Sequence, residues 1–221
     1  VEELSKSIDN ELLFSKIDLN LSKGDKVLLY SRDSRATTSF YQIITDNLTS
    51  DSGNFKWGVT TNHSYLPLDN SQFFVKNISL VDWLRNWAKT EEEREEVYLR
   101  GFLGKMIFSG EEALKKCTVL SGGEKVRCMI SKMMMKKGNV LILDEPTNHL
   151  DLESITAFNN SLNNFKGTVL FSTHDHQFAK TIANRIVELT PKGVIDRYMK
   201  FDEYMSDAKI KELRESMYNL S

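Results

Sequence analysis

Two adjacent acids end the most apolar segment of the sequence. Asp144 and Glu145 directly follow Val140-Leu141-Ile142-Leu143. In a parallel α/β sheet, ligands collect at the carboxyl ends of the strands, so we expect these acids to face a site. Successive strand side chains point in opposite directions, which lets Asp144 hold Mg²⁺ while Glu145 addresses a water beside a phosphate. A strand end followed by a polar turn would explain Asp144 or Glu145 alone. It explains poorly why both acids occur together with the motifs around them.

A serine and two glycines stand at the start of a long helical pattern upstream of these acids. The stretch reads Ser121-Gly122-Gly123-Glu124 and follows Leu120. Glycine permits close backbone approach, and the free amides and the dipole at a helix N-terminus form an anion site suited to phosphate. Ser121 adds a hydroxyl donor. A plain serine cap with a Gly-Gly turn is the alternative for this tetrapeptide alone, but its combination with Asp144 and Glu145 favours a phosphate site.

Composition limits the classes of protein to which the chain can belong. Its 221 residues are 40% hydrophobic and 27% charged, which supports a substantial core and disfavours disordered or fibrous classes. The formal charge of -2 shows no global basic excess for nucleic acid or an anionic membrane. No apolar run approaches the roughly 20 residues that cross a bilayer, and the first residues show no secretory signal. We therefore expect a soluble protein without membrane insertion, whose Cys117 and Cys128 are reduced cytosolic thiols.

Short apolar runs alternate with amphipathic runs, which is typical of an α/β fold with a largely parallel central sheet. We expect strands at residues 26–30, 139–143, 168–173, 185–189 and 193–199. The clearest helix spans residues 121–137, with apolar side chains recurring on one face. Methionines 133–135 are interpreted as core residues of this helix rather than as a promiscuous binding surface.

The chain is expected to form a single domain of 221 residues with an inserted helical part. From Leu80 to Lys116 the pattern predicts consecutive helices, with capping boxes at Thr90 with Glu93 and at Ser109 with Glu112. Residues from about 80 to 128 therefore form the predicted helical subdomain. Residues 1–79 and 129–204 form the predicted core with its β portion, and residues 205–221 one closing helix.

The order of these motifs resembles that of the ATP-binding cassette (ABC) family. Leu120–Glu124 is similar to its signature, Asp144-Glu145 to the end of its Walker B strand, and residues 148–151 to its D-loop. His174 is similar to its switch histidine. The resemblance implies a P-loop NTPase-like nucleotide-binding domain with a largely parallel central sheet, an antiparallel β portion and an inserted helical subdomain.

The resemblance also implies roles for these residues. Glu145 would polarise the attacking water and His174 would steady the γ-phosphate, while Asp144 and Thr37 would arrange Mg²⁺. The ATP-binding residues would include Ser121, Gly122, Gly123, Glu124 and Asp151. In this family the signature loop serves the nucleotide of a partner cassette, so ATP, Mg²⁺ and a second cassette are implied.

More narrowly, Asp144–Asp151 resembles the ABC-F subgroup of twin-cassette proteins, many of which act on ribosomes during translation. The Tyr-rich closing strand and helix resemble the second cassette of such a protein. The resemblance implies a cytoplasmic protein, a partner cassette in the same full-length chain and a ribosome as a further partner.

The expected phosphate loop departs from the family pattern. A Walker A loop reads G-x-x-x-x-G-K-[ST], whereas the corresponding stretch is Ser31, Arg32, Asp33, Ser34, Arg35, Ala36, Thr37 and Thr38. Both glycines and the lysine are absent, and Ala36 is placed at the lysine position. Thr37 still offers a hydroxyl to Mg²⁺, and Arg32 or Arg35 would replace part of the lost charge, although Asp33 opposes phosphate.

Two further nucleotide contacts of the family are weakened. The aromatic residue that stacks on adenine would fall near Ile8, with Phe14 as a substitute or a core residue, and Leu68 stands at the glutamine of the Q-loop. We therefore interpret the chain's own nucleotide pocket as degenerate and its signature loop as intact.

Three functional hypotheses follow from the contrast between a degenerate nucleotide pocket and an intact signature loop. The first is one half of a composite ATPase in which two cassettes sandwich ATP, the isolated chain being weak or inactive. The second is a catalytically silent cassette that acts as a binding or regulatory half. The third is the nucleotide-binding subunit of a membrane transporter, which the Asn148-His149-Leu150-Asp151 stretch disfavours.

Overall fold

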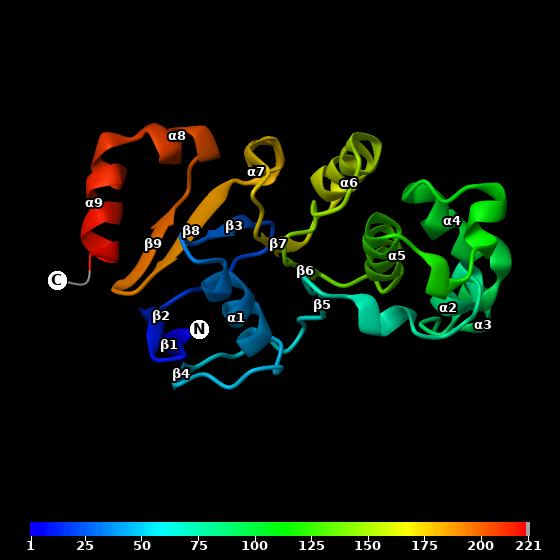
Figure 1. Ribbon diagram of the computed structural model, residues 1–221, viewed down its shortest axis with the longest axis horizontal. Helices are drawn as coiled ribbons and strands as arrows, with labels where there is room; N and C mark the ends of the chain where they lie inside the picture. Colours follow the sequence, from blue (N-terminus) through cyan, green and yellow to red (C-terminus); the bar gives the residue numbers. More distant parts are fainter. Residues whose placement is uncertain (220–221) are drawn as a thin grey trace.

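The computed structural model describes residues 1–219, which form two β-sheets and the helices that cover them (Figure 1). The elements in chain order are β1 (Glu2–Ile8), β2 (Glu11–Ile17), β3 (Lys26–Tyr30), α1 (Ser34–Ile44), β4 (Ser52–Asn54), β5 (His63–Leu66), η1 (Ser71–Phe74), α2 (Leu80–Arg85), α3 (Glu91–Arg94), α4 (Glu96–Lys105), η2 (Gly110–Leu114), η3 (Cys117–Val119), α5 (Gly122–Met135), β6 (Val140–Leu143), α6 (Leu152–Asn164), β7 (Thr168–Phe171), α7 (His176–Ile182), β8 (Arg185–Thr190), β9 (Gly193–Arg197), α8 (Phe201–Ser206) and α9 (Ala208–Tyr218). The η elements are 3-10 helices. None of the helices between residues 1 and 219 has the length and apolar composition that crossing a membrane requires.

The larger sheet has the strand order β5-β6-β7-β3-β8-β9. Its strands are parallel except that β9 runs antiparallel to β8. The five strands predicted from apolar runs are β3, β6, β7, β8 and β9, so the largely parallel α/β architecture is confirmed. The structure adds β5 at one edge and a smaller antiparallel sheet in the order β2-β1-β4.

Side chains of β6 alternate between two hydrophobic cores on the two faces of the larger sheet. Val140 and Ile142 pack with α1 and β2, whereas Leu141 and Leu143 pack with α5, α6 and α7. Because alternate residues share a face, the residue that follows Leu143 points to the α1 side. This alternation positions Asp144 before any polar contact is considered.

The helical segment predicted from Leu80 onward leaves and rejoins the core at one place. Ser79 and Lys116 form an isolated antiparallel bridge, and the amide of Cys117 donates to the Ile78 carbonyl oxygen at 2.9 Å. Figure 1 shows α2, α3 and α4 at one end of the molecule, beside α5. The predicted capping residue Thr90 accepts from the Glu93 amide at 3.2 Å, and Ser109 with Glu112 forms a complete capping box.

The predicted helix at 121–137 is α5, and its methionines fill the core. Met133 and Met135 are buried, so their interpretation as core residues is confirmed, whereas Met134 is only partly buried and also lines a cavity. Ser121 caps the helix through the Glu124 amide. The helix therefore begins where the two glycines stand.

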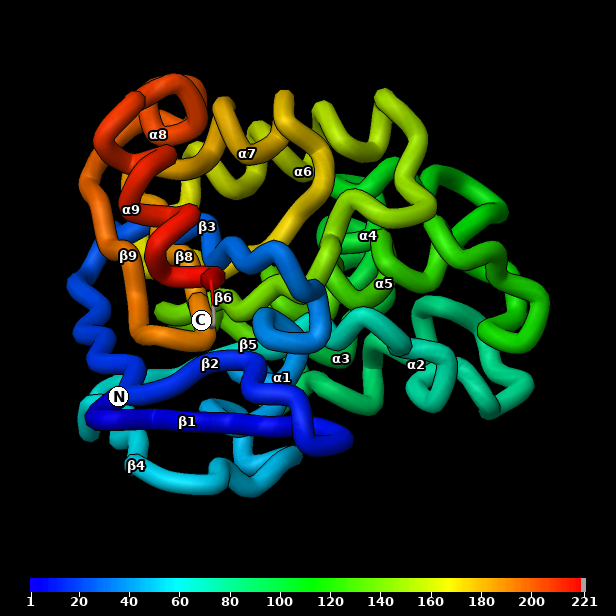
Figure 2. Tube along the Cα trace, turned by 60° about the vertical axis from the view of Figure 1, so that its left-hand side comes forward, coloured from blue at the N-terminus to red at the C-terminus, as the bar shows by residue number. Residues whose placement is uncertain are grey.

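The chain end differs from the single helix predicted for residues 205–221. Asp207 separates α8 from α9, and its side chain caps α9 by accepting from the Ile210 amide at 2.9 Å. An aspartate that caps a new helix is favoured outside helical backbone geometry, which explains the break. Residues 220 and 221 lie outside the described part of the chain. Figure 2 shows α9 lying across β8 and β9, where Arg214 pairs with the fully buried Glu188 at 2.7 Å.

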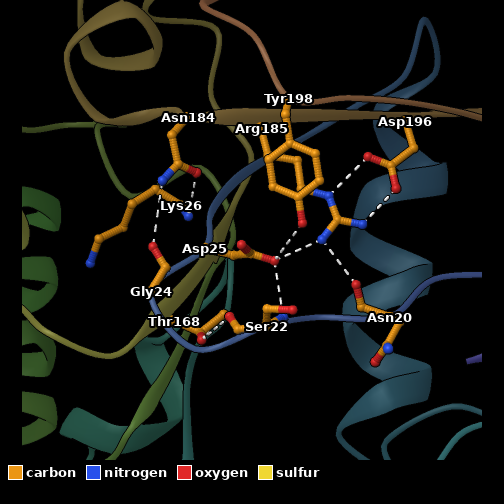
Figure 3. A network of polar contacts seen from close by, with 10 residues as sticks. All are labelled: Asn20, Ser22, Gly24, Asp25, Lys26, Thr168, Asn184, Arg185, Asp196 and Tyr198. Carbon is orange, nitrogen blue, oxygen red and sulfur yellow. Dashed lines mark hydrogen bonds and ion pairs between the residues drawn. The ribbon is translucent and has the colours of Figure 1, made fainter.

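A buried polar network joins the amino ends of β3 and β8 (Figure 3). The Arg185 guanidinium pairs with Asp25 at 2.7 Å and with Asp196 at 2.5 Å, and its side chain is 5% exposed. The Tyr198 ring lies 4.7 Å from the guanidinium carbon, and the Lys26 amide donates to Asn184 at 2.8 Å. Two carboxylates and one arginine thus fix the register of these strands at the end opposite to Asp144.

Replacing Arg185 with methionine should lower the free energy of unfolding by about 3–5 kcal/mol, because Asp25 and Asp196 lose their buried partner. Urea denaturation measures this loss, and adding Asp25→Asn to Arg185→Met should recover part of it. A loss below about 1 kcal/mol would contradict a stabilising role for the network. The exposed Lys211→Met serves as the matched control.

Candidate functional site

The carboxyl ends of β6, β7 and β3 lie next to one another, because these strands are neighbours in the sheet. Asp144 and Glu145 follow β6, Ser172 to His174 follow β7, and the connection to α1 follows β3. Parallel alignment therefore brings the predicted residues Asp144, Glu145 and His174 to one edge of the sheet.

Asp144 is buried and holds two hydroxyl groups. Thr38 Oγ1 donates to Asp144 Oδ2 at 2.8 Å, and Ser172 Oγ donates to Asp144 Oδ1 at 3.1 Å. Burial raises the pKa of Asp144 above its usual range, although the two hydroxyl donors partly offset this effect. The result is a buried carboxyl group held by hydroxyl groups from two other segments.

Thr37, which was predicted to arrange Mg²⁺ together with Asp144, does not contact Asp144; the neighbouring Thr38 does. Thr37 is buried, and its hydroxyl donates to the Ser34 carbonyl oxygen at 2.9 Å within the first turn of α1. Adjacent helical residues point about 100° apart, so only one threonine can face β6. That residue is Thr38.

Glu145 makes two contacts with His174. The His174 amide donates to Glu145 Oε2 at 3.1 Å, and His174 Nε2 lies 3.5 Å from Glu145 Oε1. Glu145 has a φ of +48°, a left-handed conformation that costs energy for a residue with a Cβ and is often found at functional sites. Burial raises the pKa of Glu145, and the neighbouring His174 acts in the opposite direction. The His174 side chain is 77% exposed, so this pair faces open space at the sheet edge.

Sequence patterns missed two residues beneath this pair. Ser172 donates to Asp144, and it also accepts from the Glu145 amide at 3.2 Å. Tyr41 is fully buried near Asp144, and the pKa of its hydroxyl is raised mainly by burial and then by the Asp144 charge. Tyr41 lies three residues after Thr38 on the same helical face, which was the available signal for it.

The two arginines of the predicted phosphate loop contact acids of this chain. Arg35 pairs with Asp33 at 2.7 Å and also with Glu11. These contacts neutralise the cation that was expected to replace the missing lysine charge. Asp33 also caps α1 by accepting from the Arg35 amide at 2.9 Å, and hydrogen bonding from Arg35 lowers its pKa.

Helix α9 holds the other arginine of this loop. Arg32 pairs with Glu215, and its guanidinium carbon lies 4.3 Å from the centre of the Tyr218 ring. The Arg32 amide donates to the Tyr218 hydroxyl at 3.0 Å, and this hydroxyl donates to the Leu189 carbonyl oxygen at 3.0 Å. A backbone amide of the loop is therefore already engaged by the C-terminal helix.

The remaining predicted loop residues complete the turn into α1. The Ser31 hydroxyl accepts from the Asp33 amide at 3.3 Å, Ser34 is the first residue of α1, and Ala36 is fully buried. The Ala36 methyl group packs in the hydrophobic core on the α1 side of the sheet.

The predicted signature residues form a separate group at the start of α5. Ser121 and Glu124 make a capping box, and Lys115 Nζ donates to Glu124 at 2.7 Å. A Cβ atom on Gly123 would lie 2.4 Å from the His149 carbonyl oxygen, and one on Gly122 would lie 3.3 Å from His149 Cγ. Glycine at 123 is thus required by the approach of the predicted D-loop.

No hydrogen bond or ion pair within residues 1–219 joins this group to the loop at 31–38. Asp151 caps α6 by accepting from the Ser154 amide at 2.7 Å, and this hydrogen bond lowers its pKa.

The residues at the expected adenine and Q-loop positions differ in burial. Phe14 is fully buried, and its ring centre lies 6.1 Å from that of Phe40, so it is a core residue. Leu68 is 54% exposed.

Residues 14–148 match the family described as "ABC transporter". The chain is 51% identical over 219 residues to the uncharacterized ABC transporter ATP-binding protein YkpA of Bacillus subtilis, covering 99% of this chain and 40% of that protein. It is 28% identical over 213 residues to the energy-dependent translational throttle protein EttA of Escherichia coli, covering 92% of this chain and 38% of EttA. The chain thus spans about two fifths of the length of these relatives.

Solved structures confirm the predicted fold class. The dimeric structure of MJ0796, a bacterial ABC transporter cassette, has a TM-score of 0.72 at 18% identity and covers 90% of this chain and 97% of that chain. A putative metal-chelate type ABC transporter in an inward-facing conformation has a TM-score of 0.74 at 20% identity, covering 95% and 85% respectively.

The close approach of the D-loop predicts different costs for two neighbouring substitutions. Gly123→Ala should lower the free energy of unfolding by about 1–3 kcal/mol, because its methyl group meets backbone. Gly122→Ala should cost less, since the His149 side chain can rotate. Urea denaturation of both variants measures the difference, and equal costs would contradict the packing described for residue 123.

The buried carboxyl of Glu145 predicts a pH-dependent change in stability. Its folded-state pKa is raised, so protonation stabilises the fold below the unfolded pKa of about 4.3, and this contribution is lost as pH rises through the folded value. Glu145→Gln should therefore match the unaltered chain near pH 4 and exceed its unfolding free energy by about 1 kcal/mol near pH 7.

Chemical denaturation across this pH range tests the expectation. The exposed Glu212→Gln is the control and should show no such trend. A stability advantage of Glu145→Gln that shrinks with rising pH would contradict the burial effect.

Proposed function

Because the chain belongs to the ABC transporter family, we propose that it is the cassette of an ABC-F type ATPase that binds Mg-ATP at an interface with a second cassette. The observation that carries this proposal is the assembly at the ends of β6 and β7. Asp144 holds Thr38, and Glu145 contacts His174, within one edge of the sheet. In such an arrangement one carboxylate can bind a cation while the other orients a water molecule.

The oxygen atoms at Asp144 fit a magnesium ion. Mg²⁺ binds proteins through one or two carboxylates, retains several waters and takes further oxygens from substrate phosphates. Asp144 and Thr38 would supply the carboxylate and the hydroxyl, in place of the expected Asp144 and Thr37. When bound, the ion would neutralise charge on the phosphates.

Glu145 and His174 have distinct roles in this proposal. Glu145 orients and polarises the attacking water, for which its buried position beside an exposed histidine is suited. His174 donates a hydrogen bond to the γ-phosphate from the open side of the pair. Catalysis by such groups consists largely of positioning and charge stabilisation.

The signature group serves the nucleotide of the partner cassette in this proposal. Ser121, Gly122, Gly123 and Glu124 lie apart from the chain's own loop, and Asp151 lies in the D-loop beside them. The dimeric cassette to which the fold is similar supports a two-cassette arrangement. The relatives' greater length supports a partner cassette in the same full-length chain. We infer from the resemblance of the closing strand and helix that this cassette would be the second.

We infer further that this ATPase is cytoplasmic and associates with ribosomes, and the name of one relative, which refers to translation, favours this form of the proposal. EttA is named as a translational throttle protein, and an ABC transporter F family member of Arabidopsis thaliana is 29% identical over 224 residues. The stretch Asn148-His149-Leu150-Asp151, which resembles the ABC-F subgroup, favours this assignment. A transporter subunit is disfavoured on the same residues.

A catalytically silent cassette is the second candidate, and the phosphate loop favours it. Arg32 and Arg35 are paired with Glu215, Glu11 and Asp33, so neither is placed as a free substitute for the missing lysine. With Thr38 at the magnesium position, Thr37 occupies the lysine position and Ala36 that of the second glycine. The loop would then bind phosphate weakly and leave turnover to the partner's site.

Calorimetric titration with Mg-ATP tests both candidates. Ser31→Gly, Ala36→Gly and Thr37→Lys together recreate G-x-x-x-x-G-K-T and should produce micromolar binding, about -8 kcal/mol. The silent-cassette candidate predicts that the unaltered chain binds at least about tenfold more weakly, whereas the ATPase candidate predicts micromolar binding by the unaltered chain as well.

Thr38→Ala in the recreated loop is the matched test of the magnesium position and should weaken binding again. A recreated loop that binds no Mg-ATP would contradict the nucleotide site. Micromolar binding by the unaltered chain would contradict the silent cassette.

A further inference from the structure

A cavity of about 920 Å³ opens at the end of the larger sheet opposite to Asp144 and His174. It is lined by Val140 and Thr168, the first residues of β6 and β7, and by Ile44 at the end of α1. Its volume lies within the range of about 300–1,000 Å³ that is usual for ligand pockets. The nucleotide site proposed above makes no use of it.

Positive charge without negative charge surrounds this cavity. Lys23, Lys56, Lys137 and Lys166 line it, and no aspartate or glutamate does so within residues 1–219. Lys23, Lys56 and Lys166 are exposed, and the described part of the chain gives them no ion pair. Unpaired lysines around a concave surface raise the local concentration of anions.

A fifth lysine lies beneath the rim. Lys26 Nζ donates to the carbonyl oxygens of Phe165 and Gly167 at 2.7 and 3.1 Å. Burial and the neighbouring Lys166 lower the pKa of Lys26 to about 8. An anion bound in the cavity would offset the repulsion between the positive charges of Lys26 and Lys166.

Aromatic rings form part of the wall, and they are held in place. The Trp57 indole donates to the Ile44 carbonyl oxygen at 2.8 Å and stacks on His63 with ring centres 5.0 Å apart. A Cβ atom on Gly167 would lie 2.5 Å from Phe165 Cζ, so glycine is needed for the position of that ring. Half-buried Phe55 also lines the cavity.

We propose that this cavity binds single-stranded RNA, with Lys23, Lys56 and Lys166 on the backbone phosphates and Trp57 and Phe165 against the bases. Exposed lysines beside two aromatic rings suit a ligand that has both phosphate charge and flat rings. The bases would use the ring surfaces that His63 and Lys26 leave uncovered on Trp57 and Phe165. An acidic peptide would use the lysines but not the rings. The inference rests on the proposed association with ribosomes, which would supply the RNA.

Fluorescence anisotropy with labelled oligouridylate and oligoadenylate of about 12 nucleotides tests this site. Lys23→Gln, Lys56→Gln and Lys166→Gln together should weaken binding about tenfold and reduce the slope of log K against log salt by about two, between about 50 and 200 mM salt. A control triple, Lys76→Gln, Lys209→Gln and Lys211→Gln, removes equal charge from exposed lysines elsewhere and should leave Kd and slope unchanged.

Trp57→Leu separates base stacking from charge. It should weaken RNA binding severalfold without changing the salt slope, and circular dichroism checks that it folds. Absence of binding by the unaltered chain, equal weakening by both lysine triples, or competition by polyglutamate as strong as that by RNA would overturn the proposal.

These outcomes are independent of the nucleotide site, because the titration contains no ATP. The pocket triple should bind Mg-ATP as the unaltered chain does. Ribosome co-sedimentation of the unaltered chain without RNA binding would overturn the pocket while retaining the proposed partner.

Discussion

Satisfying the Asp144 carboxylate is the constraint on which the site depends. This group is withdrawn from water at the end of β6, and a buried carboxylate is stable only where donors replace its lost hydration. The donors are Thr38 and Ser172, which lie 106 and 28 residues away in sequence. The pairing of β6 with β7 already brings Ser172 beside Asp144, and the hydrogen bond from Thr38 adds α1 to this arrangement. The position of the loop before α1, and of Glu145 after Asp144, follows from this alignment.

The predictable parts of the fold are those in which burial is reflected in residue type. β6 is apolar on both faces, so its strand and the site at its end follow from sequence. β5 reads His-Ser-Tyr-Leu at a sheet edge and β1 is largely polar, so their patterns carry little signal, whereas the mainly apolar β2 carried a signal that was missed. At the site, neighbouring strand ends predict that Asp144, Glu145 and His174 meet. The choice between Thr37 and Thr38 depends on helix rotation, which identical residue types do not encode.

Long-range partners explain the remaining difference between expectation and structure. Sequence reasoning assigned Arg32 and Arg35 to an incoming phosphate, because their partners were not visible locally. Glu215 lies 183 residues from Arg32, and Glu11 lies 24 residues from Arg35. The loop is consequently neutralised by its own chain, and α9, anchored by the buried Arg214–Glu188 pair, belongs to the environment of the loop. In the signature group, the capping box of Ser121 and Glu124 is local and follows from the sequence, whereas the approach of His149 to Gly123 does not.

The single bridge between Ser79 and Lys116 has a consequence for how this protein can change. Both ends of the intervening segment leave the core side by side, while buried residues of the segment, among them Leu84 and Leu103, pack in the same hydrophobic core as Leu143. Sequence changes at the exposed positions of this segment leave that core untouched. The outer surface of the segment can therefore diversify at a different pace from its buried face and from the sheet.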